Sequence, residues 1–174
     1  MTKSYVVDPE TGKLLTAQEY ESKGGNTTDI EMIAIVPDDG SPAFAMPVET
    51  FGKGKWKKAM QIAESYKAPH HIEGSDGTFT LPSRKQAVDI RAARESGLEQ
   101  LLDSILADEL LYELRNCWGW TREAYIPAGT SEEDWESKRY SSGRAWIYDY
   151  VGMSSDAGLS DGQLTVRPVT LLKL

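Results

Sequence analysis

Leu164-Thr165-Val166-Arg167-Pro168-Val169, near the C-terminus, is the stretch from which the architecture is best inferred. Its pattern predicts a strand, and Pro168 places the end of that strand at the edge of a sheet because proline cannot donate a ladder hydrogen bond. The strand closes a Gly-, Ser- and Asp-rich stretch that contains four of the five tryptophans. The large aromatic residues of this stretch are Trp118, Trp120, Tyr125, Trp135, Tyr140, Trp146, Tyr148 and Tyr150. Such a mixture combines large contact areas with adaptable hydrogen bonds, and it favours a binding surface over a reaction centre.

A second strand is predicted at residues 145–151, just upstream of this C-terminal strand. Because strand side chains alternate between the two faces of a sheet, three aromatic residues should share one face. These residues are Trp146, Tyr148 and Tyr150. Asp149 falls on the opposite, apolar face, where an unpaired charge would be too costly. We therefore expect either an exposed strand end at Asp149 or an ion pair with Arg144 or Arg167.

The rest of the sequence alternates between strand and helix patterns. Residues 1–29 are polar and turn-rich, and we expect them to form an arm that packs on the body or on a partner. The elements expected after the arm are strands at 30–36 and 44–48 that can pair as a hairpin, helices at 55–66 and 83–95, and a third helix from about residue 97 to 110. A capping box of Ser83 with Gln86 marks the start of the second helix.

The composition limits the classes of protein that fit the sequence. The 174 residues suffice for one domain, or one domain with an arm. A formal net charge of −8 would repel a phosphate backbone, so we expect no nucleic-acid partner. The lysines within residues 53–58 are interpreted as a solvated helix face. The single cysteine, Cys117, excludes an internal disulfide and is expected to be a small buried hydrophobe.

The sequence shows no segment with the pattern of a membrane anchor. No apolar run approaches the length of a membrane span, and the first residues lack the apolar core of a signal peptide. We therefore expect no membrane insertion and a cytoplasmic or virion-associated location.

Five short motifs, taken in order, resemble a bacterial and phage C-type-lectin-like family. They are Trp56 with Ala59, Leu81-Pro82-Ser83-Arg84, Trp120-Thr121-Arg122-Glu123, Ala145-Trp146, and Val166-Arg167-Pro168-Val169. The resemblance covers residues 30–174 and implies an α+β, C-type-lectin-like fold with two or three helices flanking a small, twisted antiparallel sheet. Variable proteins of diversity-generating retroelements and phage receptor-binding proteins use this fold to display aromatic and polar residues. Arg122 stands where that family usually has a small residue.

The function expected from these features is recognition of a protein or glycan ligand, without catalysis. The residues expected to bind the ligand are Arg122, Glu123, Tyr125, Trp135, Tyr140, Arg144, Tyr148 and Tyr150. Trp118, Trp120 and Trp146 are expected to be core instead, because a small lectin-like domain needs large aromatic side chains to fill it.

No cofactor and no metal site are expected. The calcium-dependent sugar-binding members of the lectin family carry tripeptides such as Glu-Pro-Asn and Trp-Asn-Asp, and these do not occur here. The adjacent pair His70-His71 is interpreted as part of a surface loop. Phosphate-loop, zinc-protease and serine-hydrolase motifs do not occur in the sequence either.

Two alternatives to the recognition function remain open at the level of sequence. The chain could be a structural phage virion or tail subunit, whose aromatic face would be an assembly interface in a homo-oligomer. It could also be a hydrolase that uses Glu123, Asp149 or Asp156 as acid and base, which would require two convergent carboxylates in a deep pocket.

Overall fold

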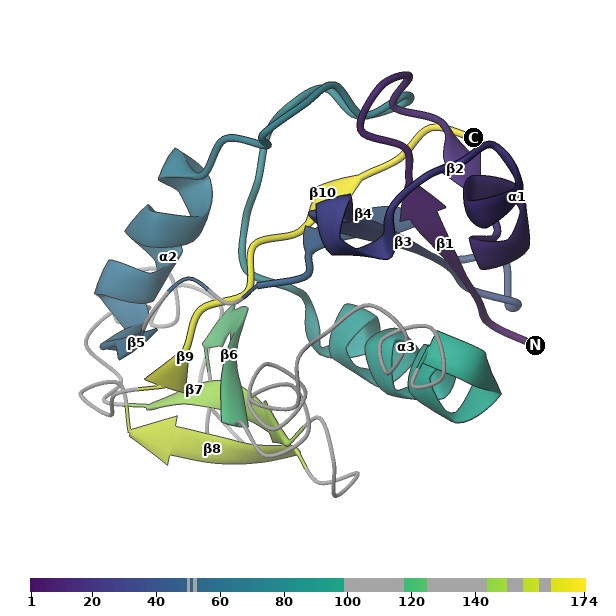
Figure 1. Cartoon of the computed structure of the whole chain (residues 1–174). Coiled ribbons are helices and arrows are strands. Elements are labelled where there is room, and N and C mark those ends of the chain that lie inside the picture. The colour runs from purple at the N-terminus through teal and green to yellow at the C-terminus, as the bar shows by residue number, and fades with distance from the viewer. Residues whose placement is uncertain (50, 52, 99–117, 125–143, 150–154, 160–163) are drawn as a thin grey trace.

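The computed structural model describes residues 1–49, 51, 53–98, 118–124, 144–149, 155–159 and 164–174. Within these ranges the chain is an α+β protein with two five-stranded sheets and short helices packed against them (Figure 1). The α+β class expected from the sequence is therefore confirmed. The single small sheet that was expected is replaced by two sheets.

The first sheet has the strand order β10-β4-β3-β1-β2, and every neighbouring pair in it is antiparallel. Its strands are β1 (Lys3–Val7), β2 (Leu14–Leu15), β3 (Met32–Val36), β4 (Phe44–Pro47) and β10 (Thr170–Leu171). The expected hairpin of residues 30–48 is confirmed, because β3 pairs antiparallel with β4.

Residues 1–29, expected as an arm, contribute two strands to this sheet. Strand β1 lies between β3 and β2, and its Val6 and Val7 side chains are fully buried. The segment therefore packs on the body as an integral part of the sheet. Helix α1 (Ala17–Ser22) follows, begun by a capping box of Thr16 with Glu19. A 3₁₀ turn, Thr27–Asp29, leads into β3.

The second sheet has the strand order β5-β9-β6-β7-β8. Its strands are β5 (Lys53–Gly54), β6 (Trp118–Ala124), β7 (Arg144–Asp149), β8 (Ser155–Leu159) and β9 (Leu164–Thr165). The pairing of β6 with β9 is parallel, and the other pairs are antiparallel.

Two longer helices pack against these sheets, and both follow the sequence pattern closely. Helix α2 (Trp56–Ser65) buries its apolar stripe, and α3 (Arg84–Ala93) begins at the expected capping box. The Gln86 N–H donates to Ser83 Oγ at 3.0 Å, and the Ser83 N–H donates to Gln86 Oε1 at 2.8 Å. After α3 the chain makes a π-type turn, Arg94–Leu98, where Gly97 adopts a φ of 121°. The third helix expected after this turn lies outside the described residues.

The C-terminal strand is shorter than expected, because the chain leaves one sheet for the other. Only Leu164 and Thr165 pair within the second sheet, and Thr170 and Leu171 join the first sheet beside β4. Figure 1 shows this segment crossing between the sheets in yellow. Pro168 interrupts the ladder within the crossing, and Val169 exchanges backbone hydrogen bonds with Thr80 at 2.8 and 3.0 Å.

One core cluster lies between α2 and the second sheet, and we call it the indole cluster. Its buried members are Trp56, Ala59, Met60, Ala63, Leu81, Trp120, Ala145 and Val166. The Trp56 Nε1–H donates to the backbone oxygen of Thr121 at 2.9 Å, and the Trp120 Nε1–H donates to that of Gly54 at 2.8 Å. Two buried indoles thus link β6 to the segment formed by β5 and the start of α2: Trp56 donates from α2 to β6, and Trp120 donates from β6 to β5. The burial of Trp120 confirms its expected place in the core.

Trp120→Phe should lower the free energy of unfolding by about 2–4 kcal/mol, because it leaves the buried Gly54 carbonyl without its donor and opens a cavity. Chemical denaturation followed by circular dichroism measures this change. Met60→Leu is the matched control, since it keeps the volume of the same cluster and touches neither indole hydrogen bond. A cost for Trp120→Phe no larger than that of Met60→Leu would contradict the role assigned to the indole.

Candidate functional site

Strand β6 carries the part of the expected binding surface that the structure describes. Trp120 and Thr121 are buried, and Arg122 and Glu123 are partly exposed. The register between β6 and β7 shifts between Trp120 and Ala124. Within this irregular stretch the Arg122 N–H donates to the backbone oxygen of Pro82 at 3.0 Å, and Pro82 lies on the segment that leads into α3. Irregularities of this kind re-aim side chains and are common next to functional sites.

Glu123 is joined to the beginning of helix α3. The backbone N–H of Arg84, the first helical residue, donates to Glu123 Oε2 at 2.7 Å. A carboxylate at this position satisfies a free helix N–H and interacts favourably with the positive end of the helix dipole. Glu123 therefore ties β6 to α3, and one of its two oxygens is engaged within the protein.

The other expected binding residues are described in part or lie outside the described residues. Arg144 and Tyr148 lie on β7, where their backbones pair with Leu159 and Ser155 of β8, and their side chains are not described. The remaining expected ligand contacts all lie outside the described residues: Tyr125, Trp135, Tyr140 and Tyr150. The structure thus brings Arg122 and Glu123 together with the backbone of β7, through the pairing of β6 and β7.

The expected core residues can be followed in the same way. Ala145 is a buried member of the indole cluster and Ile147 packs against it, so these two residues of the face lie in the core, as expected. Trp118 and Trp146 lie on strands β6 and β7, and the structure describes their backbones but not their side chains. The same holds for Asp149 and its expected ion pair. Arg167, one of the two cations considered for that pair, is only 2% exposed.

Two surface hollows are lined by residues outside the set expected to bind the ligand. One, of about 450 Å³, is bounded by the start of β3, the end of β4 and the C-terminal end of α2. The other, of about 430 Å³, lies beside His70 and His71. The His70 ring nitrogen Nδ1 is 2.9 Å from the His71 oxygen, and among the described residues no three His, Cys, Asp or Glu side chains are placed to hold a metal ion. Sequence reasoning identified neither hollow: the first is lined by three separate segments, and the second is formed by the folding of residues 67–79.

Comparison with known protein families, curated proteins and solved structures finds no match to this chain. Among the helices that the structure describes, none is long and apolar enough to cross a lipid bilayer.

Glu123→Gln should reduce the free energy of unfolding by about 0.5–1 kcal/mol, because it removes a negative charge from the N-terminal end of α3. The loss should shrink in high salt, which screens the interaction. Thermal unfolding at low and high ionic strength measures both effects. Glu64→Gln, on an exposed position of α2, is the control and should be close to neutral. Equal midpoints for Glu123→Gln and the parent protein at low salt would refute this role.

Proposed function

We propose that the protein is a non-enzymatic recognition domain with a C-type-lectin-like frame. It would bind a protein or glycan ligand through the aromatic and polar surface of its C-terminal third. The observation that carries the proposal is the convergence of all five motifs of the lectin-like resemblance on one cluster. The cluster receives Trp56 and Ala59, Leu81, Trp120, Ala145 and Val166, which are one or two residues from each motif.

The convergence supports the frame because these residues are far apart in the sequence. Each motif supplies a side chain to the same core, and hydrogen bonds between the motifs reinforce the packing. Trp56 bonds to the strand that contains Trp120, and that strand bonds to Pro82 and Arg84 at the start of α3. Phe51, which lies outside the five motifs, adds a bond from its N–H to the backbone oxygen of Val166 at 3.0 Å. The short motifs thus act as complementary parts of one rigid junction.

The frame also supports a binding role for the segments attached to it. Residues 125–143 connect β6 to β7, and residues 150–154 connect β7 to β8, so both connections start and end on strands of the second sheet. Binding residues are commonly carried by loops on a rigid scaffold. The expected contact residues Tyr125, Trp135 and Tyr140 belong to the first connection.

The test is a binding screen of the purified chain on glycan and protein arrays, repeated with Trp135→Ala and Tyr140→Ala. We expect both variants to lose the signal while their free energies of unfolding stay within about 0.5 kcal/mol of the parent, as for displayed side chains. Trp120→Phe is the matched variant in the frame, and its free energy of unfolding should fall, unlike those of Trp135→Ala and Tyr140→Ala.

Two results would contradict this proposal. A loss of about 3–5 kcal/mol for Trp135→Ala would show that this side chain is core. A stable oligomer in solution that Trp135→Ala or Tyr140→Ala dissociates would favour the structural subunit, with the aromatic surface as its assembly interface.

A further inference from the structure

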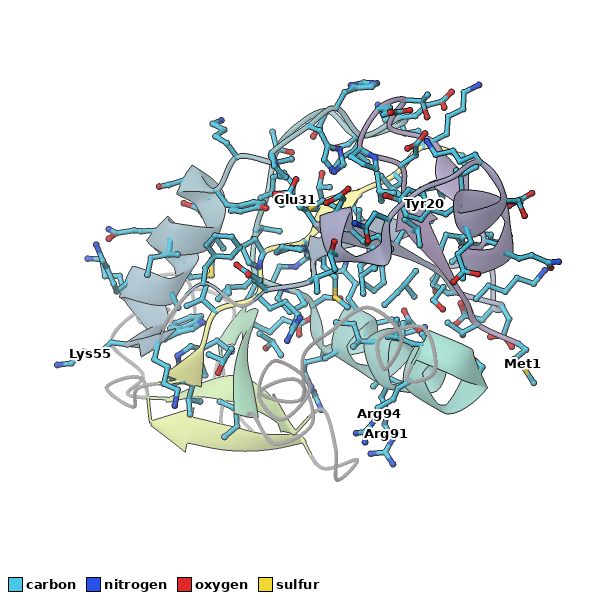
Figure 2. The ribbon with its side chains drawn as sticks, in the orientation of Figure 1. Met1, Tyr20, Glu31, Lys55, Arg91 and Arg94 are labelled. Carbon is cyan, nitrogen blue, oxygen red and sulfur yellow. The ribbon has the colours of Figure 1, made fainter. Side chains whose placement is uncertain are left out.

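The hollow of about 450 Å³ beside α2 has the composition of a site for a small ligand. It is lined by Thr28, Ile30, Glu31, Pro47, Val48, Glu49, Phe51, Tyr66, Lys67 and Pro69. In Figure 2, Glu31 lies between the C-terminal end of α2 and the first sheet. The volume is within the range of about 300–1,000 Å³ that is typical of ligand pockets.

The aromatic wall of this hollow is held in place from two sides. The centroid of the Tyr66 ring lies 4.5 Å from that of the Phe51 ring, and the two ring planes are tilted by 59°. It lies 4.7 Å from the centroid of the Phe79 ring, in an edge-on arrangement. Phe79 is buried, so it anchors Tyr66 to the core. The Tyr66 hydroxyl donates to Met32 Sδ at 3.5 Å. Phe51 and Tyr66 are both partly exposed, and they present ring surface to the hollow.

Two carboxylates lie beside this aromatic wall. A hydrogen bond of 2.9 Å from the Val48 N–H to the backbone oxygen of Glu31 holds the start of β3 against the end of β4, which brings Glu31 and Glu49 to the same hollow. Both side chains are exposed, and no lysine or arginine among the described residues forms an ion pair with them. Lys67 also lines the hollow, so the formal charges of Glu31, Glu49 and Lys67 add up to −1.

Partial burial and the two neighbouring carboxylates both act on the Tyr66 phenol. Burial, together with the nearby carboxylates of Glu31 and Glu49, raises the pKa of Tyr66 to about 12. A tyrosine phenol is neutral at physiological pH already at its ordinary pKa, so the Tyr66 ring is a neutral surface next to two negative charges.

We propose that this hollow binds an organic cation, an alkylammonium or quaternary ammonium group, which rests on Phe51 and Tyr66 with Glu31 and Glu49 as counter-charges. Aromatic faces attract such cations, and the attraction grows when the cation is partly desolvated. An anionic ligand would be repelled by the two carboxylates. A hard metal ion would need about six to eight oxygen ligands, more than two side chains supply.

Two sources can present this chemistry: a free small amine, or a methylated lysine side chain on a protein partner. The first probe is tetramethylammonium chloride, titrated at constant ionic strength against the ring signals of Phe51 and Tyr66 in NMR spectra. Tert-butanol is the uncharged probe of similar shape. A peptide containing trimethyl-lysine then distinguishes the sources: a peptide that binds more tightly than tetramethylammonium indicates a protein partner, and equal affinities indicate a free amine.

The expected result is saturable binding of tetramethylammonium with no comparable response to tert-butanol. The double variant Glu31→Gln/Glu49→Gln should weaken the affinity by about tenfold, since it removes both counter-charges. Lys67→Gln should tighten it by about two- to fivefold, since it removes a like charge. Glu64→Gln, outside the hollow on α2, is the matched control and should leave the affinity unchanged.

The proposal is overturned if tetramethylammonium causes no saturable shift, or if tert-butanol binds equally well. It is also overturned if the double variant retains the parent affinity. The opposite effects expected for Lys67→Gln and for the double variant keep the test decisive, because a general loss of structure would weaken binding in both. None of these results depends on the surface proposed for protein or glycan recognition, so failure here leaves that proposal to be judged separately.

Discussion

The reciprocal hydrogen bonds of two buried indoles are the constraint on which the second half of the fold depends. Trp56 reaches from the first turn of α2 to the Thr121 oxygen, and Trp120 reaches from β6 to the Gly54 oxygen. Both rings are almost fully excluded from solvent, so each carbonyl would lose its indole donor in a buried environment if the ring moved away. The polar ends of the indoles therefore specify one arrangement of α2 on β6, while their rings fill the core between them.

The C-terminal crossing connects this junction to the other sheet. Val166 belongs to the indole cluster, and Val169 packs in the core beneath the first sheet. The few residues between β9 and β10 thus contribute to both cores, and Arg167 is buried among them. Because Val169 also pairs with Thr80, the crossing fixes the segment that leads into α3. The two sheets are held together by packing and backbone hydrogen bonds on the same short stretch.

The features that sequence reasoning predicted correctly are those whose signals are local. The capping box at Ser83 and the apolar stripe of α2 place the helices, and the β-branched run before Pro37 places β3. The second sheet and the incorporation of β1 depend on pairings between distant segments, which no local pattern encodes. Of the candidate binding residues, Arg122 and Glu123 are described with their side chains. The bond from Glu123 to α3 and the hollow at Tyr66 arise only when the chain is folded.

Hydrogen exchange of the two indole N–H groups, followed by NMR, tests the central role of the indole junction most directly. If the junction holds the fold together, the Trp56 and Trp120 indole protons should exchange only through global unfolding, at the rate of the most protected backbone amides. The free energies of exchange of both protons should also decrease with denaturant concentration with the slope of complete unfolding. Exchange of either proton on the timescale of an exposed amide, while the core amides remain protected, would contradict the account.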